Sequence, residues 1–263
     1  MNRREAEVGG EPFLPEDSPL ATLLPHPESD PDFLFHPDVQ VVPLYGKGSI
    51  WYEQYQKLCV GLLSAAKELR ISPKVILVTS AVPAEGKTLT AVNLALTLHQ
   101  AGGHRVLLVE ADLRKPRIRS LLRRPPRHGL ADILLGKTEL EKALEEFRGS
   151  GFRILCAGET SEDSVGLLES PRLEETLAKA RERYDHIVID SPPWLPFPDA
   201  AILSEKADAV AFVVRMGTTP REDLLKSLEN LDRRRLVGII ANDVRNDETP
   251  RYYHYYRYKG SHS

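Results

Sequence analysis

The sequence predicts an α/β fold in which a mostly parallel sheet carries helices on both faces. Three observations predict it. Short apolar segments alternate with amphipathic segments from Lys74 onward, which is the pattern of a parallel sheet covered by helices. The tripeptide Gly86-Lys87-Thr88 follows the first apolar segment, and Asp190 ends a later one. Because ligands bind at the carboxyl ends of the strands in such sheets, these residues predict a binding site there.

Each element is predicted from its apolar periodicity. The first helix, over 50–69, has an apolar stripe formed by Tyr55, Leu58, Leu62 and Ala66. Strands are expected at 74–80, 105–109, 152–156, 186–189, 209–214 and 237–241, and further helices at 88–98, 130–135, 139–147 and 171–184. The sequence contains no internal repeat.

The chain divides into three segments. Residues 1–48 hold eight of the twenty prolines and are expected to form a disordered arm, because so few apolar residues cannot offset the entropy of ordering. Phe33–Phe35 in this arm is either a docking motif or part of a linker that has no binding function. Residues 49–245 are expected to form the folded domain, and residues 246–263 a flexible tail rich in tyrosine.

Composition narrows the class of protein. The chain has 263 residues, of which 41% are hydrophobic and 28% are charged. This composition is typical of soluble globular proteins. A net charge of −3 gives no reason to expect nucleic-acid binding. We expect no signal peptide and no membrane span. The two cysteines, Cys59 and Cys156, favour a reducing compartment over a disulfide framework.

The segment Ala81–Thr88 fits a phosphate-binding loop. It reads A-V-P-A-E-G-K-T, which matches G-x-x-x-x-G-K-[ST] except at its first position. The predicted strand before it and helix after it supply the required context, because free N–H groups and a positive dipole end lie at a helix N-terminus. Lys87 is expected to reach the β- and γ-phosphates of a nucleotide, and the Thr88 hydroxyl to hold Mg²⁺.

Asp190 ends the apolar strand within the element Tyr184–Pro193. An aspartate at the tip of a buried strand is the usual Walker B arrangement, which holds Mg²⁺ directly or through water. Asn242 follows the last predicted strand, where a purine base would bind, although Asn-Asp is also ordinary turn chemistry.

The motifs Ala81–Thr88, Val109–Pro116 and Tyr184–Pro193, in that order and spacing, resemble those of the bacterial tyrosine kinases (BY-kinases) that regulate capsule and exopolysaccharide export. The phrases Gly129–Gly136, Pro198–Leu203 and Val213–Gly217 support the resemblance, which covers about residues 50–245. It implies a P-loop NTPase fold of the deviant Walker type that partitioning ATPases share. It also implies an ATP-dependent, magnesium-requiring kinase that is unrelated to eukaryotic protein kinases.

The resemblance assigns roles to individual residues. It places Lys87, Thr88, Asp112 and Asp190 around Mg·ATP, with the metal at Thr88, Asp112 and Asp190. Glu110 stands where relatives carry aspartate and would accept or orient the tyrosine proton, so Glu110→Asp is expected to preserve or raise activity. The expected nucleotide-binding set is Ala84, Glu85, Gly86, Lys87, Thr88, Leu89, Arg215 and Asn242.

A cluster of tyrosines near the C-terminus completes the resemblance. The expected phosphoacceptors are Tyr252, Tyr253, Tyr255, Tyr256 and Tyr258. An extended tail reaches about 40 Å, which permits transfer within one chain or to a neighbour. Each phosphate would remove about 1.5 to 2 units of positive charge from a segment that holds Arg251, Arg257 and Lys259. Without the P-loop, the same tail would suggest binding to a membrane surface or RNA.

The resemblance also implies partners. It predicts a separate membrane polysaccharide co-polymerase that activates the chain, a cognate tyrosine phosphatase, and a cytoplasmic location at the inner face of the membrane. Self-association is also implied, but both arginines of the ring-closing motif Glu-x-x-Arg-x-x-Arg are replaced, since the corresponding residues are Glu53, Gln56 and Cys59. No nucleic-acid partner is expected.

Two other functions remain open. The first is a positioning ATPase of the chromosome-partitioning kind, although Val82 stands where those proteins carry a lysine next to the first loop position. The second is a nucleotide-sensing regulator of the polysaccharide machinery that has lost kinase activity. Glu110 and the missing arginines keep that alternative open.

Overall fold

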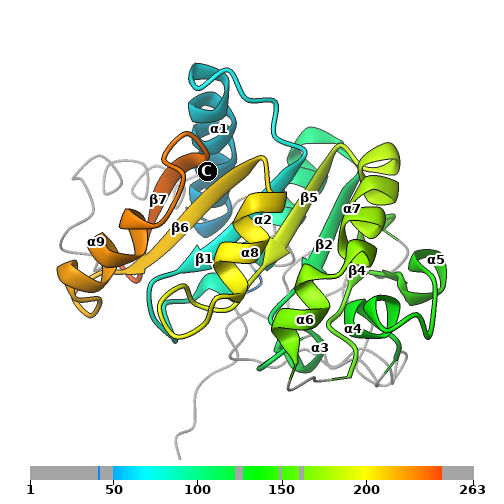
Figure 1. Cartoon of the computed structure of the whole chain (residues 1–263). Helices are drawn as coiled ribbons and strands as arrows, with labels where there is room; N and C mark the ends of the chain where they lie inside the picture. The colour runs from blue at the N-terminus through cyan, green and yellow to red at the C-terminus, as the bar shows by residue number, and fades with distance from the viewer. Residues whose placement is uncertain (1–40, 42–49, 122–126, 148–149, 160–162, 245–263) are drawn as a thin grey trace, which may run out of the picture.

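The computed structural model describes residue 41 and residues 50–121, 127–147, 150–159 and 163–244 (Figure 1). Over these ranges it is an α/β structure with one seven-stranded sheet, which confirms the fold class expected from the sequence. The segments proposed as a disordered arm (1–48, Val41 apart) and as a tyrosine-rich tail (246–263) lie outside the described residues.

The strands of the sheet are in the order β3-β4-β2-β5-β1-β6-β7. Every pairing is parallel except that of β3 with β4, which is antiparallel. Strand β1 lies between β5 and β6, so the loop that follows β1 begins between the ends of these two strands. The strands span Val75–Ser80 (β1), Val106–Glu110 (β2), Glu145–Glu146 (β3), Arg153–Leu155 (β4), His186–Asp190 (β5), Ala209–Arg215 (β6) and Leu236–Asn242 (β7).

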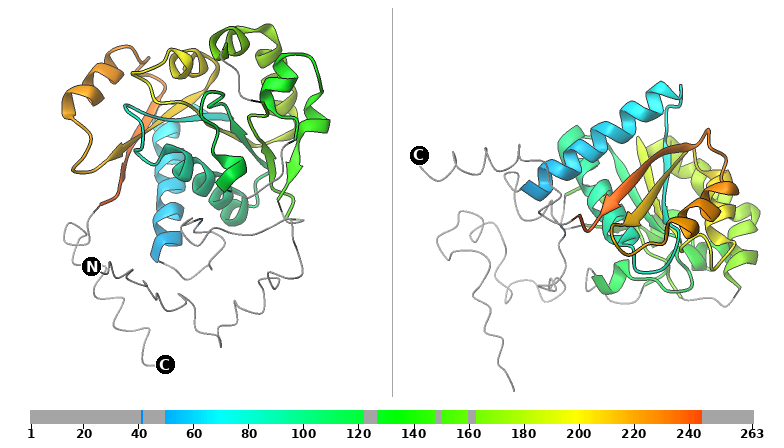
Figure 2. Two further views of the ribbon diagram at one scale, coloured as in Figure 1. Left: turned by 90° about the horizontal axis from the view of Figure 1, so that it is seen from below. Right: turned by 90° about the vertical axis from the view of Figure 1, so that its left-hand side faces the viewer.

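Helices cover both faces of the sheet, as the left view of Figure 2 shows, with α1 and α2 on one side and α7, α8 and α9 on the other. None of the helices within the described ranges has both the length and the apolar character needed to cross a bilayer. The helices span Ile50–Glu68 (α1), Lys87–Gly102 (α2), Ile118–Leu121 (α3), Leu130–Leu134 (α4), Leu140–Ala143 (α5), Ser164–Glu169 (α6), Pro171–Arg183 (α7), Asp199–Lys206 (α8) and Arg221–Glu229 (α9).

The core has two layers because successive strand residues point to opposite faces of the sheet. In β1, Val75 and Leu77 pack in the layer that contains Leu177 of α7. Ile76 and Val78 pack in the other layer, which contains Leu94 of α2. Since both faces of the central strands are buried, these strands are continuously apolar rather than alternating.

Two expectations need correction. The predicted helix over 139–147 is helical only in α5, because Glu145–Glu146 (β3) pairs with Ile154 and Arg153 of β4. In α1, Leu62 and Ala66 are buried as expected, and Leu58 packs half-buried against the same core cluster. The buried face also includes Tyr52 and Cys59, which were not expected, whereas Tyr55 is half-buried.

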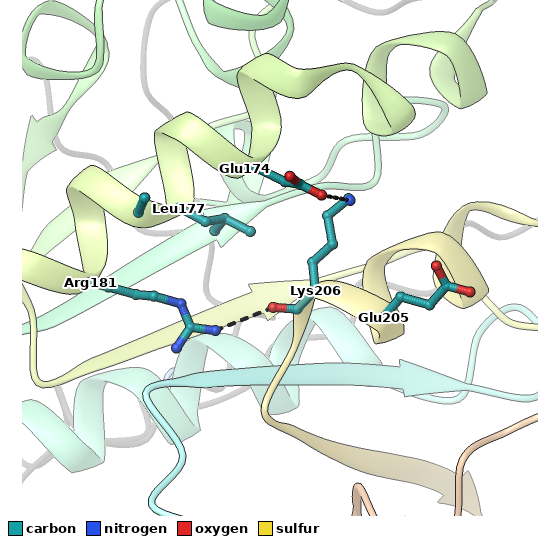
Figure 3. A pocket seen from close by; sticks show the side chains of 6 residues that line it. Glu174, Leu177, Arg181, Glu205 and Lys206 are labelled. Carbon is teal, nitrogen blue, oxygen red and sulfur yellow. Dashed lines mark hydrogen bonds and ion pairs between the residues drawn. The ribbon is translucent and has the colours of Figure 1, made fainter.

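A salt bridge joins α7 to the loop before β6 at the amino ends of the strands. Arg181 binds Asp208 through two N–H bonds of 2.7 and 2.8 Å, and Asp208 also accepts the backbone N–H groups of Lys74 and Val75. A groove lies alongside, between α7 and α8, where Lys206 reaches Glu174 at 2.6 Å (Figure 3). This groove is at the end of the sheet opposite the loop that follows β1.

Asp208→Asn is expected to lower the free energy of unfolding at pH 7. Burial alone raises the pKa of Asp208, but the Arg181 ion pair and the two N–H bonds outweigh it and hold the pKa below its ordinary value. The ionised group therefore stabilises the fold above the pKa of the unfolded chain, and this contribution disappears as the pH falls through the lower folded-state pKa. Since the pair is partly exposed, we expect a loss of about 1–2 kcal/mol.

Urea denaturation at pH 7 and at pH 3 measures this loss. Glu139→Gln is the matched control, because its ion pair with Lys179 is largely exposed at 3.5 Å and is expected to contribute less than about 0.5 kcal/mol. Equal effects of the two substitutions at pH 7 would contradict the assignment.

Candidate functional site

The carboxyl ends of three neighbouring strands bring the three sequence motifs together. The strand order places β5 between β1 and β2, so the loop after β1 lies beside Asp190 at the end of β5 and Glu110 at the end of β2. The register pairs Glu110 with Asp190 and Val78 with Asp190. The sequence positions that we expected to converge are therefore neighbours at one edge of the sheet.

The loop 81–86 turns sharply into α2. Ala84 and Gly86 have φ values of 66° and 89°, in the left-handed region that glycine tolerates best. A side chain at Gly86 would also collide with Asn242, whose Nδ2 atom lies 2.1 Å from an added Cβ. Gly86 is the residue before the first turn of α2, so the free backbone N–H groups of that turn lie at the loop.

The Glu85 side chain points into the protein, toward the segment after β6. Its side chain is 2% exposed, and one carboxylate oxygen accepts the backbone N–H of Val82 at 2.7 Å. The other oxygen accepts the Thr219 hydroxyl and the Arg215 backbone N–H. The Glu85 side chain thus joins the loop to the segment after β6, a contact that the motif pattern did not indicate. The role of Glu85 in nucleotide binding stays a prediction.

Asn242 and Arg215 lie at the same edge of the sheet. The Asn242 amide donates to the Glu85 carbonyl at 2.9 Å, and the Arg215 guanidinium pairs with Asp243 at 2.8 Å. Asn242 is therefore tied to the backbone of the loop, beside the position where we expected a purine base. Their roles in nucleotide binding stay predictions, as does that of Leu89, which is half-buried in the first turn of α2.

Lys87 contacts Asp112, one of the three candidate metal ligands. Its Nζ atom lies 3.4 Å from Oδ2 of Asp112, and both side chains are nearly buried. The other oxygen of Asp112 accepts the backbone N–H of Lys115 at 3.0 Å. The lysine charge is therefore held at the loop by a carboxylate that also fixes the turn after β2.

Asp190 is a buried carboxylate without a hydrogen-bond partner. It is 1% exposed, and neither oxygen has a hydrogen bond of normal geometry among the described residues. Burial raises the pKa of Asp190 to about 7, and the Lys87 charge and the Thr88 hydroxyl oppose this rise only in part. An unpaired carboxylate inside a protein is costly, so this one indicates a group that is satisfied when a ligand binds.

The residues present fit a magnesium ion bound together with a nucleotide. No three His, Cys, Asp or Glu side chains within the described ranges form a metal cluster. A site made by Asp112, Asp190 and the Thr88 hydroxyl would thus need phosphate oxygens and water for its other ligands. Mg²⁺ is bound in this way in most nucleotide sites, because it keeps several waters and uses one or two carboxylates.

The Glu110 carboxylate, unlike that of Asp190, accepts hydrogen bonds from the backbone. Its side chain is fully buried, and Oε1 accepts the backbone N–H groups of Arg117 and Ile118, each at 2.5 Å. Oε2 accepts the N–H of Ala157 at 3.0 Å. Burial raises the pKa of Glu110, and these three N–H bonds oppose the rise. The carboxylate lies at the predicted edge of the sheet but is directed at the backbone.

A buried ion pair near the site was missed in the sequence. Arg114 binds Asp199 through contacts of 3.0 to 3.2 Å, and its guanidinium lies 4.4 Å from the centre of the Phe197 ring. Asp199 is fully buried. The pair joins the loop after β2 to the start of α8. Arg114 lies two residues after Asp112 in Val109–Pro116, one of the motifs that carry the family resemblance, and this position was the signal that could have identified it.

The proposed phosphoacceptors lie outside the described residues: Tyr252, Tyr253, Tyr255, Tyr256 and Tyr258.

Comparison with known proteins gives the family. Residues 73–234 match the family described as AAA domain. The tyrosine-protein kinase YwqD of Bacillus subtilis is 32% identical over 217 residues, which are 82% of this chain and 90% of YwqD. The succinoglycan biosynthesis transport protein ExoP of Rhizobium meliloti is 35% identical over 202 residues, which are 74% of this chain but 25% of ExoP.

A solved structure agrees with these relatives. The kinase domain of the Escherichia coli tyrosine kinase ETK superposes with a TM-score of 0.69 at 29% identity, over 73% of this chain and 75% of that domain. The sequence resemblance, the matched family and the shared fold converge on one assignment. The chain belongs to the bacterial tyrosine-protein kinases, within the AAA-domain family.

Proposed function

We propose that the chain transfers the γ-phosphate of ATP to tyrosines of its own C-terminal cluster in a magnesium-dependent reaction. The observation that carries the proposal is the unpartnered Asp190 carboxylate beside Lys87 and Asp112. A site that leaves a buried carboxylate unsatisfied is suited to a cationic ligand. The five tyrosines of the tail supply an acceptor in the same chain.

The residues of the chain act by positioning and by charge, which is how most phosphoryl transfer is catalysed. The N–H groups at the start of α2 would bind the phosphates, and Lys87 would exchange its contact with Asp112 for the β- and γ-phosphate oxygens. Asp112 and Asp190, with the Thr88 hydroxyl, would hold the magnesium ion. When bound, the ion neutralises the charge that develops on the transferred phosphoryl group.

The biological role is proposed from the relatives. ExoP is named for succinoglycan biosynthesis and transport, so we propose that this chain regulates the polymerisation and export of an exopolysaccharide or capsule. A separate membrane co-polymerase would activate it at the inner face of the membrane, and a tyrosine phosphatase would reverse the modification. Self-association would control whether transfer occurs within one chain or between neighbours.

One observation favours a second candidate, a nucleotide-sensing regulator without kinase activity. The Glu110 carboxylate, which we expected to accept the tyrosine proton, is directed at backbone N–H groups. The two candidates differ in one product, since only the kinase would place phosphate on tyrosine.

Replacing the five tail tyrosines by phenylalanine is expected to abolish this product. Purified chain is incubated with Mg·ATP, alone and with membranes that contain the co-polymerase, and phosphotyrosine is detected by antibody and mass spectrometry. Phenylalanine keeps the ring but removes the acceptor hydroxyl, so nucleotide binding should not change. Tyr45→Phe is the control, because Tyr45 is not part of the cluster. A phosphotyrosine signal that survives in the five-site variant would contradict the proposed acceptors.

A further inference from the structure

Glu110 joins two segments that are distant in the sequence. Through Oε1 it accepts N–H groups at the start of α3, from Arg117 and Ile118. Through Oε2 it accepts the N–H of Ala157, which follows β4. A carboxylate that receives three backbone N–H groups fixes the segments that carry those groups.

The segment fixed in this way includes two residues of the site. The loop 111–117 begins where the Ala111 N–H donates to the Asp190 carbonyl at 2.8 Å, and it ends at the N–H groups that Glu110 accepts. Between these two anchors lie Asp112, which contacts Lys87, and Arg114, which binds Asp199. Glu110 therefore holds one end of the loop that carries Asp112.

We propose that Glu110 is a positioning residue that holds the 111–117 loop against the nucleotide site, and that it is not the acceptor of the tyrosine proton. The proposal rests on the proposed kinase reaction, for which it reassigns one residue. It replaces the expectation, drawn from the family pattern, that this carboxylate meets the substrate hydroxyl.

To accept the tyrosine proton, Glu110 would need a carboxylate oxygen that the tyrosine hydroxyl can reach. A carboxylate oxygen has two lone pairs, so Oε2 retains one after its bond to Ala157. The side chain is nevertheless fully buried, and a tyrosine hydroxyl would reach it only after the N–H bonds to α3 or to the end of β4 were broken. A general base has to lie within hydrogen-bond distance of the proton it accepts.

The length of the side chain separates the two roles. Aspartate keeps the charge but is shorter by one methylene, so it would not span from the start of α3 to the segment after β4. Glutamine keeps the length, and its oxygen would still accept the Arg117 and Ile118 N–H groups, but its amide would face the Ala157 N–H. A base needs the charge, whereas a positioning residue needs the length.

The experiment compares Glu110→Asp with Glu110→Gln in the complete 263-residue chain. If Glu110 positions the loop, the Asp variant should lose about a hundredfold in kcat, as displacement of a catalytic group by about 1 Å does. The Gln variant should lose only about tenfold, as expected for one lost hydrogen bond to a charged group. Glu141, an exposed carboxylate that pairs with Arg183, is the control, and its Asp and Gln variants should match the wild type.

Two further readouts separate positioning from general destabilisation. Affinity for a fluorescent ATP analogue, titrated in Mg²⁺, should weaken in the Asp variant more than in the Gln variant. Hydrogen exchange should quicken at the amides of Arg117, Ile118 and Ala157 in the Asp variant, while the amides of β1 keep their protection.

The opposite order would overturn the proposal: an active Asp variant and an inactive Gln variant, both with unchanged nucleotide affinity and amide protection. The same experiment distinguishes this failure from that of the proposed function. If the wild type forms no phosphotyrosine, the kinase reaction is wrong, and nucleotide affinity and amide exchange still decide whether Glu110 holds the loop.

Discussion

Replacing Lys87 by methionine is expected to lower phosphotyrosine formation by about a thousandfold, the upper range for removal of one group that stabilises transition-state charge. Methionine keeps the apolar stem of the side chain but removes the ammonium group that would reach the β- and γ-phosphates. The measurement is the initial rate of phosphate incorporation from Mg·ATP into the purified chain.

The fold should survive this change, because Lys87 is the first residue of α2 and lies outside the two core clusters. Lys137→Met is the matched control, since Lys137 is half exposed and pairs with Glu159 at 3.0 Å. Its rate should equal that of the wild type. A Lys87→Met variant that retains the wild-type rate would show that the loop does not bind the transferred phosphate.

Asp190→Asn is expected to change activity and stability in opposite directions. Phosphate transfer should be lost, because the proposed magnesium site would keep only one carboxylate, Asp112. The nucleotide-free protein should be more stable at pH 8, because the substitution removes a buried carboxylate that lacks a hydrogen-bond partner. Such opposite effects on activity and stability are typical of residues that bind a ligand and lack a partner in the ligand-free protein.

The pH dependence of this stability follows from the pKa of Asp190, which burial raises from 3.8 to about 7. Between these values the unfolded chain has released the proton and the folded chain retains it, so stability falls as the pH rises. Above pH 7 the ionised group costs up to about 4 kcal/mol. Asparagine removes this cost, but burial of its amide offsets part of the gain. We therefore expect Asp190→Asn to raise the free energy of unfolding by about 2 kcal/mol at pH 8 and to leave it unchanged at pH 4.

Thermal and urea unfolding at these two pH values, without nucleotide or metal, measure the effect. Asp185→Asn is the control, because Asp185 is partly exposed and is paired with Arg105 at 2.8 Å. Asp185→Asn should not raise the free energy of unfolding at either pH. A loss of stability in Asp190→Asn at pH 8 would mean that Lys87 and Thr88 stabilise the charged form by more than burial destabilises it.

Much of the fold could be predicted because the central strands are short and buried on both faces. Their continuous apolar runs, such as Val75–Ser80, are separated by turn residues and amphipathic helices, and this pattern has few other solutions. The strand β3 could not be predicted, because Glu145 and Glu146 have low strand propensity. Only the antiparallel pairing with β4, which follows after a short connection, makes this pair of residues a strand.

The sequence predicted which residues lie at the same edge of the sheet, but not which groups their side chains contact. Lys87 and Asp112 meet because their strands end at the same edge of the sheet, which the topology requires. The direction of a side chain depends on partners that no local pattern reveals. Glu85 faces Thr219, and Glu110 faces the backbone of α3. Both carboxylates belong to motifs that suggested contact with a ligand.

The most direct measurement is the transfer of radiolabelled γ-phosphate from Mg·ATP to the purified chain, followed by peptide mapping of the label. The account predicts label on tyrosines of segment 246–263, dependent on magnesium and lost in Lys87→Met. Label released only as inorganic phosphate, with none on tyrosine even when the membrane co-polymerase is present, would contradict it.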